Sequence, residues 1–262
     1  MSGFIIDDSI AHYEVLGRGK PVVFLHGWIG SWRYWIPAMQ TISISYRAYA
    51  LDLWGFGDSA KNEKLYTLEK QINLLDRFFA ETGIGKVVLI GHGLGAVLAT
   101  LYAVQNAFTV DRFMAVSLPI KKGDLDERFK TDSANNLATL LLSQTAAAEA
   151  VSAEVSKIDE RAIRASLEEI NFLDMYSITR QLNTASLLVH GQSDPAVKVP
   201  DMWNNGDLPS MLHHIVFEDS GHFPMLDEPS KFHRLVVDFL ELSSGESPQQ
   251  LQLKDEWKRR VR

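Results

Sequence analysis

Short apolar runs recur along the chain and alternate with segments of helical periodicity. Runs of five or six residues cover 21–25, 46–51, 86–90, 113–117, 185–190 and 214–218. Continuous apolar runs of this length are typical of strands that helices cover on both faces. Apolar residues spaced three or four apart predict helices over 68–81, 94–104 and 232–242. This alternation predicts an α/β fold with a mostly parallel sheet and helices on both faces.

The segment 121–182 interrupts the alternation. It is rich in Ala, Glu and Leu and contains no strand signal, so it predicts several helices inserted between two strands. Open α/β sheets bind their ligands at the carboxyl ends of the strands, and we expect the insertion to lie there as a helical cap. Helices that pack away from the site are the alternative.

The last twenty residues differ from the rest. Residues 1–242 are expected to form one domain that includes the cap, because a chain of 262 residues can bury a single core of this size. The segment 243–250 has the composition of a linker, and 251–262 is a short, basic, amphipathic tail. We expect the tail to dock on the domain or to fray. Binding to a membrane surface or a partner is the weaker alternative, because the segment is short for that role.

Composition and charge exclude several classes of protein. The formal net charge is −7, which argues against general nucleic-acid binding because that function needs clustered Lys and Arg. Cysteine is absent, which excludes disulfides, thiolate metal sites and a cysteine nucleophile. Residues 1–15 do not have the pattern of a secretory signal, and no apolar run is long enough for a transmembrane segment. We therefore expect a cytoplasmic protein, of open oligomeric state.

A glycine-rich turn follows the apolar run at 86–90. The sequence GHGLG at 91–95 ends that run and begins the helix predicted from residue 94. This is the position of a nucleophile elbow, G-x-S-x-G, but its middle residue is Gly93. The elbow raises its central side chain above the sheet, and its outer positions are too tight for a Cβ. A dinucleotide-binding turn fits less well, because the acidic residue and second βαβ unit of that fold are missing.

Other motifs follow in a specific order. They are HGW at 26–28, LDLWGFGDS at 51–59, HGQSDP at 190–195 and SGHFPMLDEP at 220–229. With these motifs around GHGLG, the chain resembles the α/β-hydrolase superfamily across about residues 10–242. The resemblance is strongest to the small esterase and haloperoxidase-like branch.

The resemblance implies roles for five positions. Gly93 takes the position of the nucleophile, His222 that of the catalytic histidine, and Asp194 that of the acid that orients it. The backbone N–H groups of Trp28 and Leu94 take the positions of the oxyanion hole. The resemblance implies neither a cofactor nor a metal. We expect the remaining polar residues of the motifs to shape loops or orient backbone, and these are Asp52, Asp58, His26 and His92.

The glycine at the apex changes the expected chemistry. Serine hydrolases attack with a hydroxyl and the dehalogenase branch of the family with an aspartate, and Gly93 offers neither, so no covalent intermediate can form there. We expect Asp194 and His222 to lie within hydrogen-bonding reach, with His222 facing an empty space above Gly93. Asp194 could instead only begin a turn before Pro195, and His222 could be a loop histidine.

Four interpretations stay open. The protein could be a small-ligand-binding relative without hydrolase activity, which is the interpretation we favour. It could use His222 and Asp194 as a general base, to activate water or to deprotonate a substrate, as cofactor-free oxygenases of this fold are thought to do. It could be a serine ester hydrolase whose nucleophile was replaced. Finally, the true nucleophile could lie elsewhere, at Ser31 or Ser117. The expected partner is a small-molecule ligand or an ester-like substrate, whose identity the sequence does not give.

Overall fold

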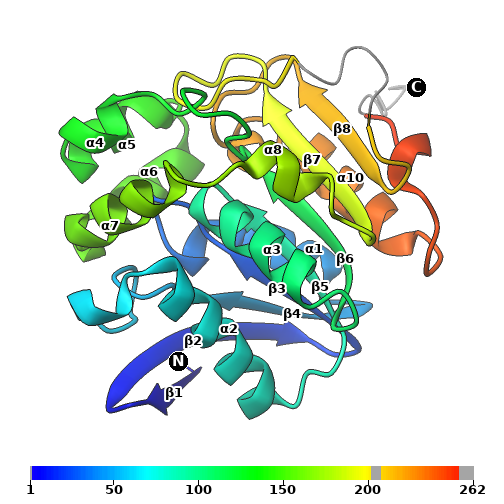
Figure 1. Ribbon diagram of the computed structural model, residues 1–262, viewed down its shortest axis with the longest axis horizontal. Helices are drawn as coiled ribbons and strands as arrows, with labels where there is room; N and C mark the ends of the chain where they lie inside the picture. Colours follow the sequence, from blue (N-terminus) through cyan, green and yellow to red (C-terminus); the bar gives the residue numbers. More distant parts are fainter. Residues whose placement is uncertain (1, 202–207, 254–262) are drawn as a thin grey trace, which may run out of the picture.

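One mostly parallel sheet forms the centre of the protein, in a computed structural model that describes residues 2–201 and 208–253 (Figure 1). Its strand order is β1-β2-β4-β3-β5-β6-β7-β8. The strands are β1 (Ser2–Ile6), β2 (Ser9–Gly17), β3 (Lys20–Leu25), β4 (Tyr46–Leu51), β5 (Val87–His92), β6 (Val110–Val116), β7 (Ala185–Gly191) and β8 (Leu212–Phe217). The six strands from β3 to β8 are parallel to one another and correspond to the six predicted apolar runs. The predicted α/β fold is therefore confirmed.

The hairpin β1–β2 at one edge of the sheet was not predicted. It is antiparallel, with Ile6 opposite Ser9, and β2 pairs antiparallel with β4. Its two-residue turn consists of Asp7 and Asp8, which have φ angles of 45° and 62°. Two-residue hairpin turns require such angles, and aspartate tolerates them better than most residues.

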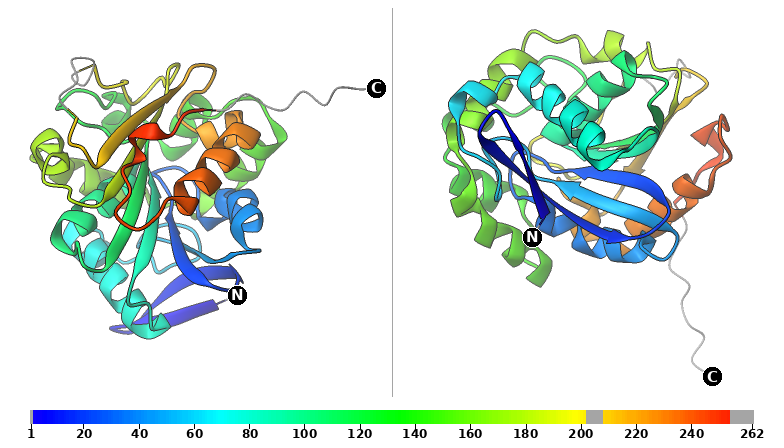
Figure 2. Two further views of the ribbon diagram at one scale, coloured as in Figure 1. Left: turned by 90° about the vertical axis from the view of Figure 1, so that its right-hand side faces the viewer. Right: turned by 90° about the horizontal axis from the view of Figure 1, so that it is seen from below.

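Helices cover both faces of the sheet (Figure 2). One face carries α2 (Leu68–Thr82), α3 (Leu94–Gln105) and α8 (Met175–Thr179), and the other carries α1 (Ile36–Ile42) and α10 (Pro229–Glu241). The short helix α9 (Pro224–Asp227) precedes α10, and the 3₁₀ turns η1 (Trp32–Trp35) and η2 (Glu63–Leu65) lie in the loops after β3 and β4. The ends of α2 follow from its sequence. Thr67 caps its N-terminus, and Gly83 ends it with a φ of 67°.

The insertion between β6 and β7 forms the cap. Its helices are α4 (Arg128–Thr131), α5 (Ala134–Leu141), α6 (Ala146–Glu154) and α7 (Glu160–Ile170), with the turn η3 (Val155–Lys157) between α6 and α7. These helices gather at the carboxyl ends of the parallel strands (Figure 1). The expected range 121–182 also contains α8, which packs against α3 on the face of the sheet. It serves as the crossover that returns the chain to the start of β7.

Residues 243–253 follow the core. The turn η4 (Pro248–Gln250) contacts β7 and β8, Leu251 is buried, and the carbonyl of Leu251 accepts a hydrogen bond from Nε2 of His213 at 2.9 Å. The basic residues of the expected tail, 254–262, lie outside the described residues, so the division at residue 243 stays a prediction. Within 2–201 and 208–253, the structure contains no helix with the length and apolar character of a membrane span.

Candidate active site

The turn from β5 to α3 retains the geometry of an elbow. Gly93 has φ 51° and ψ −112°, and its N–H donates to the carbonyl of Val116 at 2.9 Å. A Cβ on Gly91 would lie 2.2 Å from the carbonyl oxygen of Gly95, and a Cβ on Gly95 would lie 2.4 Å from that of Leu25. Both outer positions therefore exclude any side chain. At the apex, a residue with a Cβ would be strained by the positive φ.

Asp194 and His222 lie together above the ends of β7 and β8. Nδ1 of His222 is 2.8 Å from Oδ2 of Asp194, and both side chains are 1% exposed. Oδ1 of Asp194 accepts the N–H groups of Ala196 and Val197 at 2.8 and 3.0 Å. Burial opposes ionisation of Asp194, but His222 and these two N–H groups together lower the pKa of Asp194 below its usual value. The carboxylate can therefore hold the imidazole with Nδ1 protonated and Nε2 free to accept a proton.

Three polar groups near the apex lack protein partners. Nε2 of His222 has no hydrogen-bond partner in the part of the chain that the structure describes. The same is true, within 2–201 and 208–253, of the backbone N–H groups of Trp28 and Leu94, although both residues are fully buried. Buried N–H groups without an acceptor are uncommon in folded proteins. The two N–H groups can therefore bind an acceptor atom of a ligand, and Nε2 of His222 can accept a hydrogen bond from a ligand donor.

The indole of Trp28 crowds one side of the space above Gly93. A Cβ on Gly93 would lie 3.0 Å from Cε3 and 3.1 Å from Cζ3 of the Trp28 indole. The indole is fixed from the cap: its Nε1–H donates to Oγ of Ser166 in α7 at 3.0 Å, and its ring meets that of Phe129 in α4 at 5.1 Å. The ring centroids of Phe129 and His222 are 6.3 Å apart. The glycine makes room for this indole, which the sequence motif could not show.

Comparisons with known proteins agree with this architecture. The model of the alpha/beta hydrolase family matches residues 22–235. The chain belongs to the alpha/beta hydrolase family. It is 34% identical to a soluble epoxide hydrolase of Corynebacterium sp. over 43% of this chain, an alignment that spans only 41% of that enzyme. It is 24% identical to the 2-hydroxy-6-oxo-6-(2'-aminophenyl)hexa-2,4-dienoic acid hydrolase of Metapseudomonas resinovorans, over 87% of this chain and 86% of that one.

Solved structures of the family show the same fold. An esterase from Exiguobacterium antarcticum superimposes with a TM-score of 0.79 and 19% sequence identity. The match covers 90% of this chain and 97% of the esterase. These relatives are thus two hydrolases and an esterase.

The two alternative serines are engaged elsewhere in this hydrolase fold. Oγ of Ser31 donates to Glu154 at 3.1 Å, and Oγ of Ser117 donates to the carbonyl of His222 at 3.0 Å. Neither hydroxyl bonds to a ring nitrogen of His222, the arrangement that activates a serine. The geometry therefore disfavours a nucleophile at either position.

His26 bonds to backbone, as we expected. Its Nδ1–H donates to the carbonyl of Gly27 at 2.8 Å, and its Nε2 accepts the N–H of Leu53 at 3.0 Å. Both ring nitrogens are thus occupied in holding the turn that precedes Trp28. Burial lowers the pKa of His26, which keeps its ring neutral for this role.

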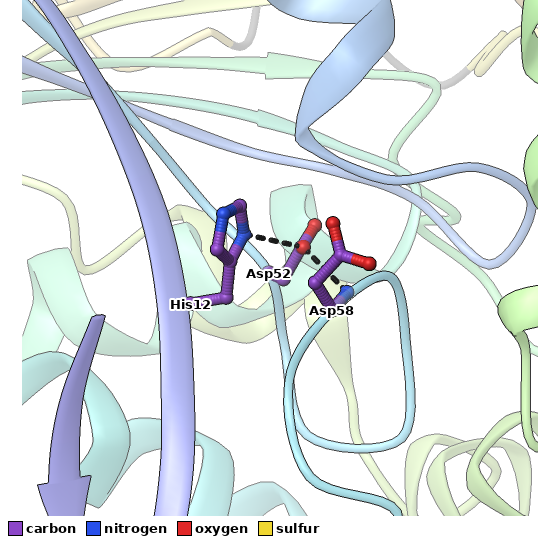
Figure 3. Close-up of side chains that lie close together, drawn as sticks. All are labelled: His12, Asp52 and Asp58. Atoms are coloured by element: carbon purple, nitrogen blue, oxygen red, sulfur yellow. Dashed lines mark hydrogen bonds and ion pairs between the residues drawn. The ribbon is translucent and has the colours of Figure 1, made fainter. Parts of the chain in front are cut away.

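A second polar cluster lies at the start of the loop after β4 (Figure 3). Possible ligand atoms of His12, Asp52 and Asp58 lie within 4.8 Å of one another, the spacing of a metal site. However, Asp52 already pairs with Nδ1 of His12 at 2.9 Å and accepts the N–H groups of Trp32 and Asp58, each at 2.9 Å. These hydrogen bonds hold the fold of the loop, so they give the two aspartates a structural role that needs no cation.

The carboxylate of Asp58 belongs to an ion-pair group that joins the cap to the core. We call this group the latch, and it consists of Arg33, Asp58, Glu154 and Lys157. Arg33 of η1 pairs with Asp58 at 3.1 Å and with Glu154 at 2.9 Å, and Lys157 pairs with Asp58 at 2.9 Å. Because Glu154 and Lys157 belong to the cap, whereas Arg33 and Asp58 belong to the core, the latch attaches the cap to the core beside Trp28 and His222.

Several contributors to the site were not predicted. Tyr34, Ser117, Phe129 and Ser166 contact the site through hydrogen bonds or rings, and none belongs to a motif of the family. A polar or aromatic residue in η1, at a strand end or on a cap helix carries no local signal of this kind. Only the tertiary packing reveals these contacts.

Proposed function

We propose that this member of the alpha/beta hydrolase family binds a small carboxylate or ester ligand without forming an acyl-enzyme. The observation that carries the proposal is the apex itself. Gly93 supplies no nucleophile, and the indole of Trp28 lies 3.0–3.1 Å from the point where the Cβ of a nucleophilic side chain would begin. An ester and its carboxylate product share the acyl oxygen, which is the atom that an oxyanion hole binds with backbone N–H groups.

The polar groups of the site support this ligand class. The free N–H groups of Trp28 and Leu94 are donors and fit one oxygen of a carboxylate. His222 can donate from Nε2 to the other oxygen once it carries a second proton. Asp194 would stabilise that protonated ring. The ligand would therefore be held by two backbone N–H groups on one oxygen and by His222 on the other.

Acetate and butyrate test this proposal. We expect calorimetric titration to show binding of both acids. The His222→Gln variant should bind at least about tenfold more weakly, since a charge-assisted hydrogen bond is removed. His233→Gln, on the outer helix α10, is the matched control and should bind as the wild type does. No binding of either acid to folded protein, or equal binding by His222→Gln, would overturn the proposal.

Labelling with a fluorophosphonate tests the absence of an acyl-enzyme. This reagent modifies serines that a histidine activates, and Gly93 has no hydroxyl. We expect no labelling of the folded protein. Stoichiometric labelling of one serine, blocked by butyrate, would contradict the proposal and identify a nucleophile elsewhere.

A second candidate function is general-base catalysis by His222. It is favoured by the buried pair with Asp194 at 2.8 Å and by the free Nε2, which is the arrangement of a histidine that an acid orients to accept a proton. If the wild-type protein turns over a substrate, His222→Ala should abolish the turnover and the fluorophosphonate should leave it unchanged. Turnover that survives in His222→Ala would exclude this candidate.

A further inference from the structure

A continuous chain of buried hydrogen bonds runs beneath the site. The N–H of Gly27 donates to Oη of Tyr34 at 2.7 Å, and Oη of Tyr34 lies 2.9 Å from Nδ1 of His92. Nε2 of His92 lies 2.9 Å from the carbonyl oxygen of His222. The chain thus connects the turn that carries Trp28 to the loop that carries His222, through the residue that precedes the apex.

The proton positions in this chain follow from its ends. A carbonyl oxygen can only accept, so Nε2 of His92 carries a proton and Nδ1 of the neutral ring accepts one. Burial and the neighbouring His222 lower the pKa of His92 well below its usual value, which keeps the ring neutral. Burial likewise raises the pKa of Tyr34 well above its usual value, so its hydroxyl stays a donor to His92. The donors are therefore the N–H of Gly27 toward Tyr34, the hydroxyl of Tyr34 toward His92, and Nε2–H of His92 toward the carbonyl of His222.

A second donor reaches the same carbonyl from β6. Oγ of Ser117 donates to the carbonyl oxygen of His222 at 3.0 Å, and the N–H of Ser117 donates to Val189 at 2.8 Å. Ser117 has a φ of 51°, in the left-handed region that residues other than glycine seldom occupy. Such strain persists only where the surroundings hold it. Here it directs the serine hydroxyl at the backbone of His222.

The turn and the loop are both fitted to the ring of His92. A Cβ on Gly27 would lie 2.8 Å from Nδ1 of His92, so this position requires glycine. The His92 ring lies 4.7 Å from the ring of His222 and 4.6 Å from that of Phe223. A shift of His92 would therefore displace both the Trp28 turn and the His222 loop.

We propose that Tyr34, His92 and Ser117 are positioning residues that clamp the carbonyl of His222 and hold its imidazole between Asp194 and the apex. The two bonds to one carbonyl fix the backbone from which the imidazole extends. The chain through Tyr34 ties that backbone to the turn that places the Trp28 N–H. The inference rests on the proposed function, because it concerns the residue that would bind or deprotonate the ligand.

The low-field proton resonance of His222 Nδ1–H provides a test without any ligand. This proton lies in the bond to Asp194, so its exchange with water reports on that bond, and its shift reports on the bond and on the neighbouring rings. Tyr34→Phe keeps the ring but removes the hydroxyl that joins Gly27 to His92. We expect it to move the resonance and to speed its exchange by about tenfold, the effect of weakening one hydrogen bond. His92→Gln keeps an N–H donor, so it should preserve the wild-type His222 resonance better than His92→Leu does.

Tyr102→Phe is the matched control. Tyr102 is also buried, and its hydroxyl donates to Asp76 at 2.8 Å between α3 and α2, away from the site. It should lose similar stability and leave the His222 resonance unchanged. If Tyr34→Phe also leaves position and exchange unchanged while folded, the clamp is refuted.

The Ser117 variants separate the hydroxyl from the strain. Ser117→Ala removes the hydroxyl and keeps a strained backbone, and Ser117→Gly removes both. The clamp predicts that both variants perturb the His222 resonance, whereas strain alone predicts that only the glycine does. Carboxylate binding is measured separately. If the resonance responds but no carboxylate binds, the proposed function falls and the positioning role stands.

Discussion

Restoring the hydroxyl at the apex is the sharpest perturbation that the structure suggests. In Gly93→Ser the new Cβ meets Cε3 of Trp28 at 3.0 Å and sits on a backbone with φ 51°. The positive φ costs about 1–3 kcal/mol and the tight contact a similar amount, about 1–3 kcal/mol. The indole cannot move freely, because Ser166 and Phe129 hold it from the cap. We therefore expect Gly93→Ser to fold with reduced stability.

The matched variant is Gly93→Ala, which brings the same Cβ without a hydroxyl. Both variants should lose similar free energy of unfolding in urea. Only the serine should gain hydrolysis of p-nitrophenyl acetate, because it alone can be activated by His222. Trp28→Leu removes the six-membered ring that crowds the apex. In that background the cost of Gly93→Ala should fall by about 1 kcal/mol or more, the size of a direct coupling.

Rates of p-nitrophenyl acetate hydrolysis complete the double-mutant cycle of positions 93 and 28. We expect Gly93→Ser with Trp28→Leu to exceed Gly93→Ala with Trp28→Leu by at least about a hundredfold, with the gain lost in His222→Ala, since a triad acts as a unit. Two results would refute the reasoning. Gly93→Ala could cost the same with and without the indole, which would show that the indole does not occupy the nucleophile space. Alternatively, the serine variants could fold and stay inactive in both backgrounds, which would show that His222 is not placed to activate a hydroxyl.

Two further predictions concern the attachment of the cap. Burial alone would raise the pKa of Asp58, but Lys157 and Arg33 lower it to about 2. Because the folded pKa lies below the unfolded value of about 3.9, the stabilisation by Asp58 is full above about pH 4 and is lost as the pH falls towards about 2. The gap in unfolding free energy between wild type and Asp58→Asn, measured in urea, should therefore shrink over that range, and a constant gap would contradict it. Ser166→Ala leaves the buried Nε1–H of Trp28 without an acceptor and should cost about 1–3 kcal/mol; unchanged stability would mean that the bond does not fix the indole.

Local patterns were sufficient for most of the fold. Continuous apolar runs predicted the six parallel strands because most of their residues are buried, and helical periodicity predicted α2, α3 and α10. Neither pattern predicted the hairpin β1–β2. One face of the hairpin is open to solvent, so its apolar residues do not form a continuous run, and only the pair Asp7-Asp8 marked its turn.

The candidate site was predictable only where it follows a motif. Asp194 and His222 each lie in the loop after a strand, within a recognisable sequence, and the structure brings their side chains to 2.8 Å from each other. The side chain of Trp28 was not predictable, since its position depends on α4 and α7, which lie more than a hundred residues later in the chain. The same holds for Ser117, whose bond to His222 spans 105 residues.

The latch also affects how fast a ligand could reach His222. With the imidazole 1% exposed and Trp28 fully buried, a ligand must wait for the cap to open, and opening breaks ion pairs of Arg33 and Lys157. The association rate would then level off at high ligand concentration, at the opening rate of the cap, instead of rising without limit. The ion pairs of the latch are partly buried, so added salt would screen them in part and raise that plateau modestly, while leaving the contacts around His222 intact. Ion pairs between the cap and the core would thus set the time a ligand waits before it enters and before it leaves.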